Sequence, residues 1–152
     1  MKPVDDDYER RTRDSFARQP AMATIGIAID EIAPGRVVLS MPHRPELTQQ
    51  HGFQHAGIVA TGLDTACGYA AFTLMPADAG VLTIEFKVNL LAPARGPRFR
   101  FEGQVAKAGR TITVVDGRAW QLDGAGDGAE PTLVATMTAT VMTVLGRSDL
   151  RH

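Results

Sequence analysis

The sequence predicts an α+β domain in which a curved antiparallel sheet wraps around a single long helix. Two observations support this prediction. The segment from Ala56 to Met75 is apolar on nearly every side, which is expected of a helix that is covered on several faces. Segments in which apolar and polar residues alternate, the pattern of half-buried strands, occur on both sides of it.

The length and composition fit one folded domain. The chain has 152 residues, of which 44% are hydrophobic and 22% are charged, so it can bury a substantial core. We expect a short N-terminal helix within residues 1–19, whose acidic first half and basic second half match the helix dipole. The folded domain should cover residues 20–145, and residues 146–152 should form a flexible tail.

The strands are predicted from their alternating residues. A hairpin is expected over residues 25–41, with its turn at Pro34 and Gly35. The long helix should end at Pro76, and the strict alternation over residues 82–90 gives the clearest strand. Further strands are expected over residues 98–105, 111–120 and 133–145, with a Gly-rich mobile loop over residues 123–131.

Charge and targeting signals exclude several classes of partner. The net charge of -1 and the absence of a basic stretch argue against nucleic acid. The N-terminus is acidic where a secretory signal is basic and then apolar, and the lone Cys67 cannot form an internal disulfide, so a cytoplasmic protein is expected. The long helix could cross a bilayer, but Asp64 lies near its centre and no basic flank or aromatic belt is present. We therefore expect no membrane association.

The stretch from Gln49 to Asp64, QQHGFQHAGIVATGLD, places polar groups at the start of the apolar helix. Unpaired N–H groups and the positive end of the dipole gather where His55, Ala56 and Gly57 open the helix, and they can hold a developing oxyanion. Asp64 lies roughly 13 Å further along the axis, too far to act with them within one helix. A buried carboxylate needs a polar partner, and the same helix of a second copy can provide one.

This pattern predicts a hydrolytic site shared across a homodimer. The spacing alone equally allows His55 to be an ordinary cap and Asp64 to be a satisfied polar residue in a dimer core.

Together with TIEFKVNLLAPARG over residues 83–96, this stretch resembles the acyl-CoA thioesterases of the phenylacetic-acid-degradation (PaaI-like) type, which have the hotdog fold. The similarity extends over roughly residues 20–145. It implies a homodimer, often paired into a homotetramer, that hydrolyses an acyl-CoA to the free acid and CoA without a cofactor. The acyl group would be small or medium in size, and an aryl group is compatible with the resemblance.

The resemblance also implies a role for each residue of the site. Asp64 would be the nucleophile or the general base that activates water. The N–H of Ala56 would polarise the thioester carbonyl, in a family that usually has glycine there, while His55 would fix the start of the helix. Gln49 would donate to the thioester or to water, and Thr83 would hold the carboxylate or a water.

Two further sets of residues are expected to bind the substrate. The CoA phosphates would meet arginines at strand ends, namely Arg95, Arg98 and Arg110. The acyl pocket would be lined by Phe53, Leu63 and Phe72, with its depth set by dimer packing.

Other chemistry receives less support from the sequence. Cys67 is expected to be a core residue, because His55 is too far along the helix to activate it. No metal is expected, because His43, Glu46 and His51 lack a recognised ligand spacing. A hotdog protein that binds acyl-CoA without hydrolysing it is the main alternative, and a hydratase or dehydratase would need a second acid beside His55.

Overall fold

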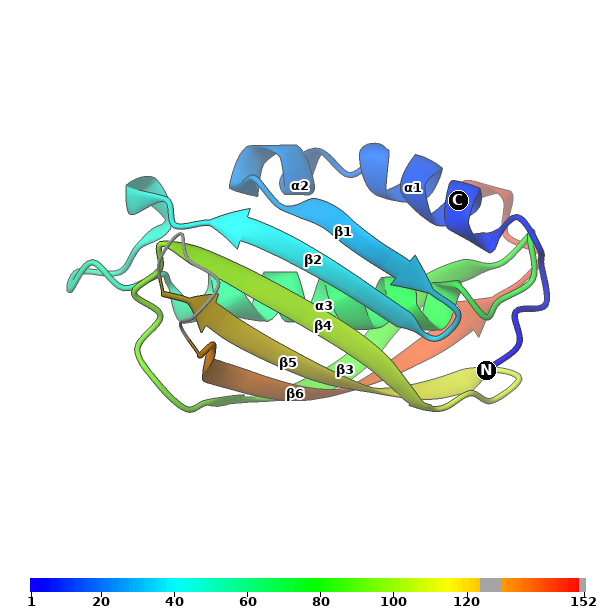
Figure 1. Cartoon of the computed structure of the whole chain (residues 1–152). Coiled ribbons are helices and arrows are strands. Elements are labelled where there is room, and N and C mark those ends of the chain that lie inside the picture. Colours follow the sequence, from blue (N-terminus) through cyan, green and yellow to red (C-terminus); the bar gives the residue numbers. More distant parts are fainter. Residues whose placement is uncertain (124–129, 151–152) are drawn as a thin grey trace.

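The computed structural model describes residues 1–123 and 130–150. The α-helices are α1 (Tyr8–Ala17), α2 (Pro20–Ile25) and α3 (Ala56–Phe72). The strands are β1 (Ala28–Ala33), β2 (Arg36–Pro42), β3 (Gly80–Leu90), β4 (Arg98–Lys107), β5 (Ile112–Leu122) and β6 (Thr132–Val144). Two short 3₁₀ helices, η1 (Pro45–Leu47) and η2 (Ser148–Leu150), complete the elements (Figure 1). Most of the predicted loop before β6, residues 124–129, lies outside the described part.

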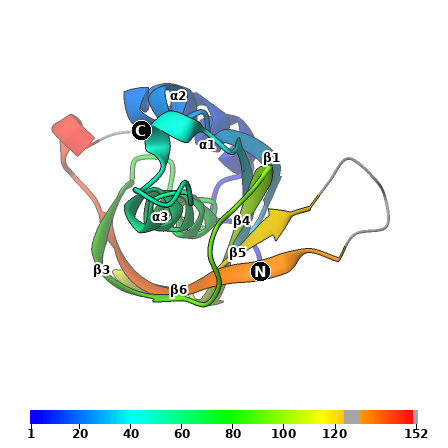
Figure 2. The ribbon, with the colours of Figure 1, turned by 90° about the vertical axis from the view of Figure 1, so that its left-hand side faces the viewer.

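The strands form one antiparallel sheet in the order β1-β2-β4-β5-β6-β3. The sheet curves around α3, and α1 and α2 lie over its open side (Figure 2). This is the hotdog fold expected from the sequence. No helix in the described residues is both long and apolar enough to cross a membrane.

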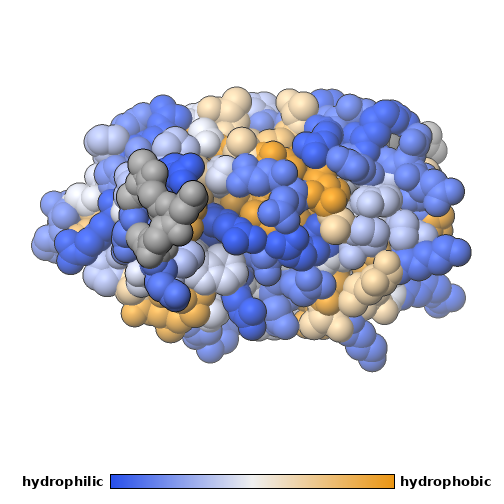
Figure 3. Space-filling view, in the orientation of Figure 1, coloured by the Kyte–Doolittle hydropathy of each residue, from blue (hydrophilic) through white to orange (hydrophobic). Residues whose placement is uncertain are grey.

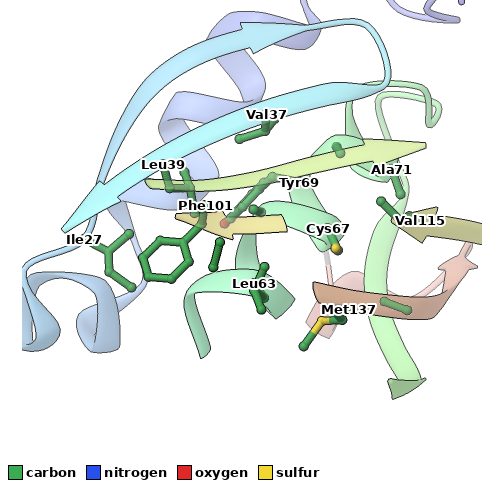
Figure 4. Close-up of a cluster of buried hydrophobic side chains, with 14 of the residues drawn as sticks. Ile27, Val37, Leu39, Leu63, Cys67, Tyr69, Ala71, Phe101, Val115 and Met137 are labelled. Atoms are coloured by element: carbon green, nitrogen blue, oxygen red, sulfur yellow. The ribbon is translucent and has the colours of Figure 1, made fainter. Parts of the chain in front are cut away.

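Two glycines allow α3 to lie directly on β4. A Cβ atom at Gly62 of α3 would be 2.7 Å from ring atoms of Phe101, and one at Gly103 of β4 would be 2.3 Å from the carbonyl oxygen of Ala66. The side chains around this crossing form the core, in which Leu63 and Cys67 of α3 are fully buried among residues of the sheet (Figure 4). The helix ends at Phe72, three residues before the expected Met75, and turn residues lead to Pro76.

The N-terminal region differs from the prediction, because it contains two helices and the hairpin begins later. Pro20 occupies the first turn of α2, where a backbone N–H would have no acceptor within the helix and its absence breaks no hydrogen bond. Gly26 ends the helix with a φ of 87°. Ile25 is therefore a buried helical residue, and the first strand begins at Ala28. The Arg11 guanidinium fixes α1 by donating to the carbonyl oxygens of Met75 (2.8 Å) and Pro76 (3.1 Å).

The predicted strict alternation in β3 is wrong at one point. The pairing of β3 with β6 shifts register between Thr83 and Glu85, which makes Ile84 the extra residue of a β-bulge. Thr83 consequently pairs with the buried Val141, so it lies on the helix-facing side of the sheet with Phe86 and not on the outer side with Glu85.

Candidate active site

The loop before α3 is held by the buried side chain of Gln54. Its Oε1 accepts from the backbone N–H of Arg44 (3.2 Å), and its Nε2 donates to the carbonyl oxygen of Leu47 (2.6 Å). Its backbone N–H donates to the carbonyl oxygen of Ala94 (2.8 Å). Gln54 is not among the residues predicted from the sequence, where its only signal is its place directly before the helix cap His55. Gln54 fixes the entrance of α3 to the segment that follows β3.

His55 caps α3 and leaves one backbone donor free of protein contacts. The Nδ1 of His55 accepts from the N–H of Gly57 (2.9 Å), and the carbonyl oxygen of His55 accepts from Ile58 and Val59. Within the described residues, the N–H of Ala56 has no protein acceptor. This N–H stands at the positive end of a 17-residue helix, where an oxyanion is stabilised.

A cavity of about 360 Å³ adjoins this helix start. Ala56, Gln49 and Phe53 line one side, and the other side includes the residues after β3. The side-chain oxygen of Gln49 accepts from the backbone N–H of His51, so its Nε2 group is the half of the amide left to donate to a ligand. The Arg95 guanidinium lies 4.5 Å from the centre of the ring of Phe53, which lines this cavity.

Asp64 lies in a different depression, a groove of about 400 Å³ between α2, α3 and the start of β3. Its Oδ1 accepts a hydrogen bond from the Oγ1 of Thr83 at 2.7 Å. The bulge at Ile84 makes this contact possible, because it turns Thr83 toward the helix. One protomer thus presents a carboxylate held by a hydroxyl in one groove, and backbone and amide donors in a separate cavity.

The other residues that were predicted to bind substrate do not lie together in the protomer. Leu63 and Phe72 are fully buried in the core and do not line either depression, so within the protomer they pack the interior. An apolar helix gives no sequence signal that separates core residues from pocket residues. Arg98 begins β4 and Arg110 follows its far end, so these two arginines lie at opposite ends of a ten-residue strand.

Cys67 is a core residue. Burial, together with the negative charges of Asp64 and Asp116, raises the pKa of its thiol to about 12. A thiolate is the nucleophilic form of cysteine, so this side chain is unsuited to attack a thioester near neutral pH. Among residues 1–123 and 130–150, no group of three His, Cys, Asp or Glu side chains is placed to hold a metal ion.

The β3 strand forms an exposed, apolar edge of the sheet (Figure 2). Leu82, Ile84, Phe86 and Leu90 remain between 42% and 55% exposed, although apolar strand residues are normally covered. The opposite face, drawn in Figure 3, is mostly hydrophilic with separate apolar patches. The edge at β3 is therefore the surface on which a partner would cover apolar side chains and also complete the sheet.

Comparisons with known proteins agree with the fold and identify the family. Residues 51–126, half of the chain, match the Thioesterase superfamily. A protein of Halobacterium salinarum named as an esterase is 33% identical over 119 residues, which cover 75% of this chain and 78% of the relative. A similarly named protein of Saccharolobus solfataricus is 33% identical over 100 residues, which cover 66% of this chain and 71% of the relative.

Solved structures extend the similarity to nearly the whole chain. A thioesterase family protein from Silicibacter pomeroyi is 58% identical, with a TM-score of 0.86, over 91% of this chain and 99% of that protein. The PaaI protein of the E. coli phenylacetic acid degradation operon shares the fold, with a TM-score of 0.79 at 16% identity over 91% of this chain and 94% of PaaI. On the family match and the sequence identities, this chain belongs to the thioesterase superfamily.

Proposed function

We propose that the protein is a PaaI-like acyl-CoA thioesterase that hydrolyses esters of small or medium acyl groups, aliphatic or aryl. The observation that supports this proposal most directly is the hydrogen bond from Thr83 to Asp64. It fixes one carboxylate oxygen at the floor of a groove and leaves the other oxygen to act on substrate or water. A carboxylate held in this way serves hydrolysis in either of two ways.

In the first route, Asp64 takes a proton from a water molecule while the water oxygen attacks the thioester carbonyl. In the second, a carboxylate oxygen of Asp64 attacks the carbonyl, and water then hydrolyses the resulting anhydride. In both routes the carbonyl oxygen gains negative charge, which the N–H of Ala56 stabilises, and the CoA sulfur leaves and takes up a proton. Gln49 donates its Nε2 to the substrate or to the water.

The reaction requires two copies of the chain. Asp64 lies eight residues after Ala56 in α3, or about 12 Å along the helix axis, so one protomer cannot bring both to one carbonyl. Antiparallel pairing of two β3 edges about a two-fold axis near Phe86 would set Leu82 of one copy opposite Leu90 of the other. Leu82 lines the Asp64 groove and Leu90 lines the cavity at the helix start, so this pairing joins the two half-sites. Two such dimers would form the tetramer expected from the resemblance.

Thiol release from a panel of aliphatic and aryl CoA esters tests the proposal. We expect turnover by the wild-type protein and a loss of at least about 100-fold in kcat for Asp64→Asn, because the substitution removes the charge and keeps the shape. Tight binding of acyl-CoA without thiol release by the wild-type protein would instead identify a non-catalytic acyl-CoA-binding protein.

Mixed dimers test whether the site is shared. A heterodimer of Asp64→Ala and His55→Ala chains contains one site with both substitutions and one site with neither, provided that each site uses Asp64 and His55 from different copies. We expect activity to reappear when the two inactive proteins are unfolded, mixed and refolded. Confirmed heterodimers that stay inactive would contradict the shared site.

A further inference from the structure

We propose that the groove beside Asp64 holds the acyl group of the substrate, and that Gly68 together with the Gln19–Tyr69 pair sets the length of the chain that it accepts. This inference rests on the proposed thioesterase function and adds the residues that select the substrate.

The groove begins at the reacting carboxylate. Thr61, Asp64, Thr65 and Gly68 of α3 form its floor, and Val81, Leu82 and Thr83 of β3 form one wall. The other wall is formed by the N-terminal helices, through Gln19, Ala21 and Met22. A thioester carbonyl placed at Asp64 therefore has its acyl substituent next to this groove.

Gly68 keeps the groove open one helical turn beyond Asp64. Apart from its chain neighbours and the backbone of its own helix, a Cβ atom at Gly68 would have no protein atom within 4 Å, so the space above it is free in the protomer. This differs from Gly62 on the same helix, where a Cβ would strike Phe101. Glycine is an unfavourable residue in a helix, and packing explains its presence at position 62 but not at position 68. The free space at Gly68 points to a ligand.

Tyr69 and Gln19 both line the groove, and in this proposal they form its far end. The buried Tyr69 hydroxyl accepts from the Nε2 of Gln19 at 3.1 Å and shares a hydrogen bond of 3.0 Å with the Oγ of Ser15. These hydrogen bonds connect the end wall of the groove to α1, so the position of the wall is fixed. The end wall follows Asp64 by five residues of helix, about 7 Å along the axis, which leaves room for a chain of only a few carbons.

The test is a chain-length profile of kcat/KM with linear acyl-CoA esters. Gly68→Leu and Ala21→Leu each place an isobutyl group in the groove, from its floor and from its wall. We expect both to lower kcat/KM for the longest accepted chain by about 10- to 200-fold relative to the shortest chain. Gln19→Ala removes part of the end wall and should move the preference toward longer chains.

Ala23→Leu is the matched control. Ala23 is an exposed residue of the same helix as Ala21 but does not line the groove, so the same enlargement should leave the profile unchanged. Circular dichroism and light scattering of each variant monitor folding and assembly. Equal losses for all chain lengths in the groove variants, or an unchanged profile, would overturn the proposal.

Two results separate this proposal from the others. Dissociation of the dimer by Gly68→Leu, with thiol release lost equally for every chain length, would mean that a second copy of the chain fills the groove, and would also overturn the proposal. Failure of the wild-type protein to release thiol from any ester would refute the thioesterase function itself.

Discussion

At the scale of single residues, the structure explains how an apolar helix tolerates a carboxylate. The Oγ1 of Thr83 satisfies one oxygen of Asp64, and a bulge one residue later in the strand directs that hydroxyl inward. The sequence suggested both residues through a family resemblance, but their contact could not be derived from it. Strict alternation puts Thr83 on the same face as Glu85, and only the pairing of β3 with β6 reverses this.

Replacing Thr83 with valine tests the importance of this hydrogen bond. Valine keeps the shape and suits a strand, but cannot donate to Asp64. A hydrogen bond to a charged group contributes about 1.5–3 kcal/mol, so we expect kcat to fall by roughly 10- to 100-fold with little change in KM. Thr83→Ser keeps the hydroxyl and should retain most activity. Steady-state kinetics measure kcat and KM for the two variants. Equal values for Thr83→Val and Thr83→Ser would mean that the Thr83 hydroxyl has only a structural role.

The buried Cys67 gives a prediction about stability at high pH. Its thiol pKa is raised from 9.0 to about 12 in the folded protein, so above pH 9 the unfolded chain loses this proton first. The contribution of the protonated Cys67 thiol to the free energy of unfolding is therefore complete below pH 9 and is lost as the pH rises toward 12.

Comparison of the wild-type protein with Cys67→Ala isolates this effect from other groups that titrate at high pH. Between pH 8.5 and 10.5, the wild-type protein should lose about 1–2 kcal/mol more unfolding free energy than the variant, measured by urea unfolding. The thiol should also resist a disulfide reagent at pH 8 until the protein is unfolded. A parallel pH dependence in the two proteins would contradict the shifted pKa.

At the scale of elements, the sequence predicted the long helix and the strands that surround it, because these depend on periodicity. The prediction from sequence was wrong or incomplete where the apolar pattern fits more than one structure. Ile25 fits a strand pattern with Ile27 and Ile29, but Pro20 starts a helix that includes it and ends at Gly26. Since α3 is apolar on nearly every side, no pattern could show that Leu63 and Phe72 face the core.

The two α3 glycines predict opposite effects of the same substitution. Gly68→Ala gains helix propensity in open space and should stabilise the protein by up to about 1 kcal/mol. Gly62→Ala gains the same propensity but overpacks the contact with Phe101, and should destabilise it by about 1–3 kcal/mol. Thermal unfolding of both variants provides the measurement. Equal shifts in Tm would mean that α3 does not press on β4 as described.

At the scale of the whole molecule, the protomer has two separate depressions and an exposed edge of the sheet between them. The cavity at the helix start and the groove at Asp64 meet opposite ends of β3. The sequence suggested a shared site from the distance between His55 and Asp64. It could not show that one edge strand borders both the cavity and the groove, because that depends on the order of strands in the sheet.

A charge in the middle of β3 should separate the copies. In Phe86→Asp, two carboxylates would face each other across the proposed two-fold axis, so we expect monomers and loss of thiol release. Ile112→Asp is the matched control, because both side chains are 42% exposed but Ile112 begins β5. Size-exclusion chromatography with light scattering measures the assembly. A Phe86→Asp protein that stays dimeric and active would rule out pairing through β3.

Gln54 connects two regions that we propose to contact the substrate, the segment after β3 and the start of α3. The backbone N–H of Gln54 donates a hydrogen bond to the carbonyl oxygen of Ala94, the neighbour of Arg95. Gln54 also directly precedes His55, which caps α3. A substrate that contacts Arg95, as proposed, would therefore be connected through Ala94 and Gln54 to the helix start that carries the N–H of Ala56. In the proposed thioesterase, binding of the CoA part of the substrate and polarisation of its carbonyl would therefore be linked through one backbone hydrogen bond.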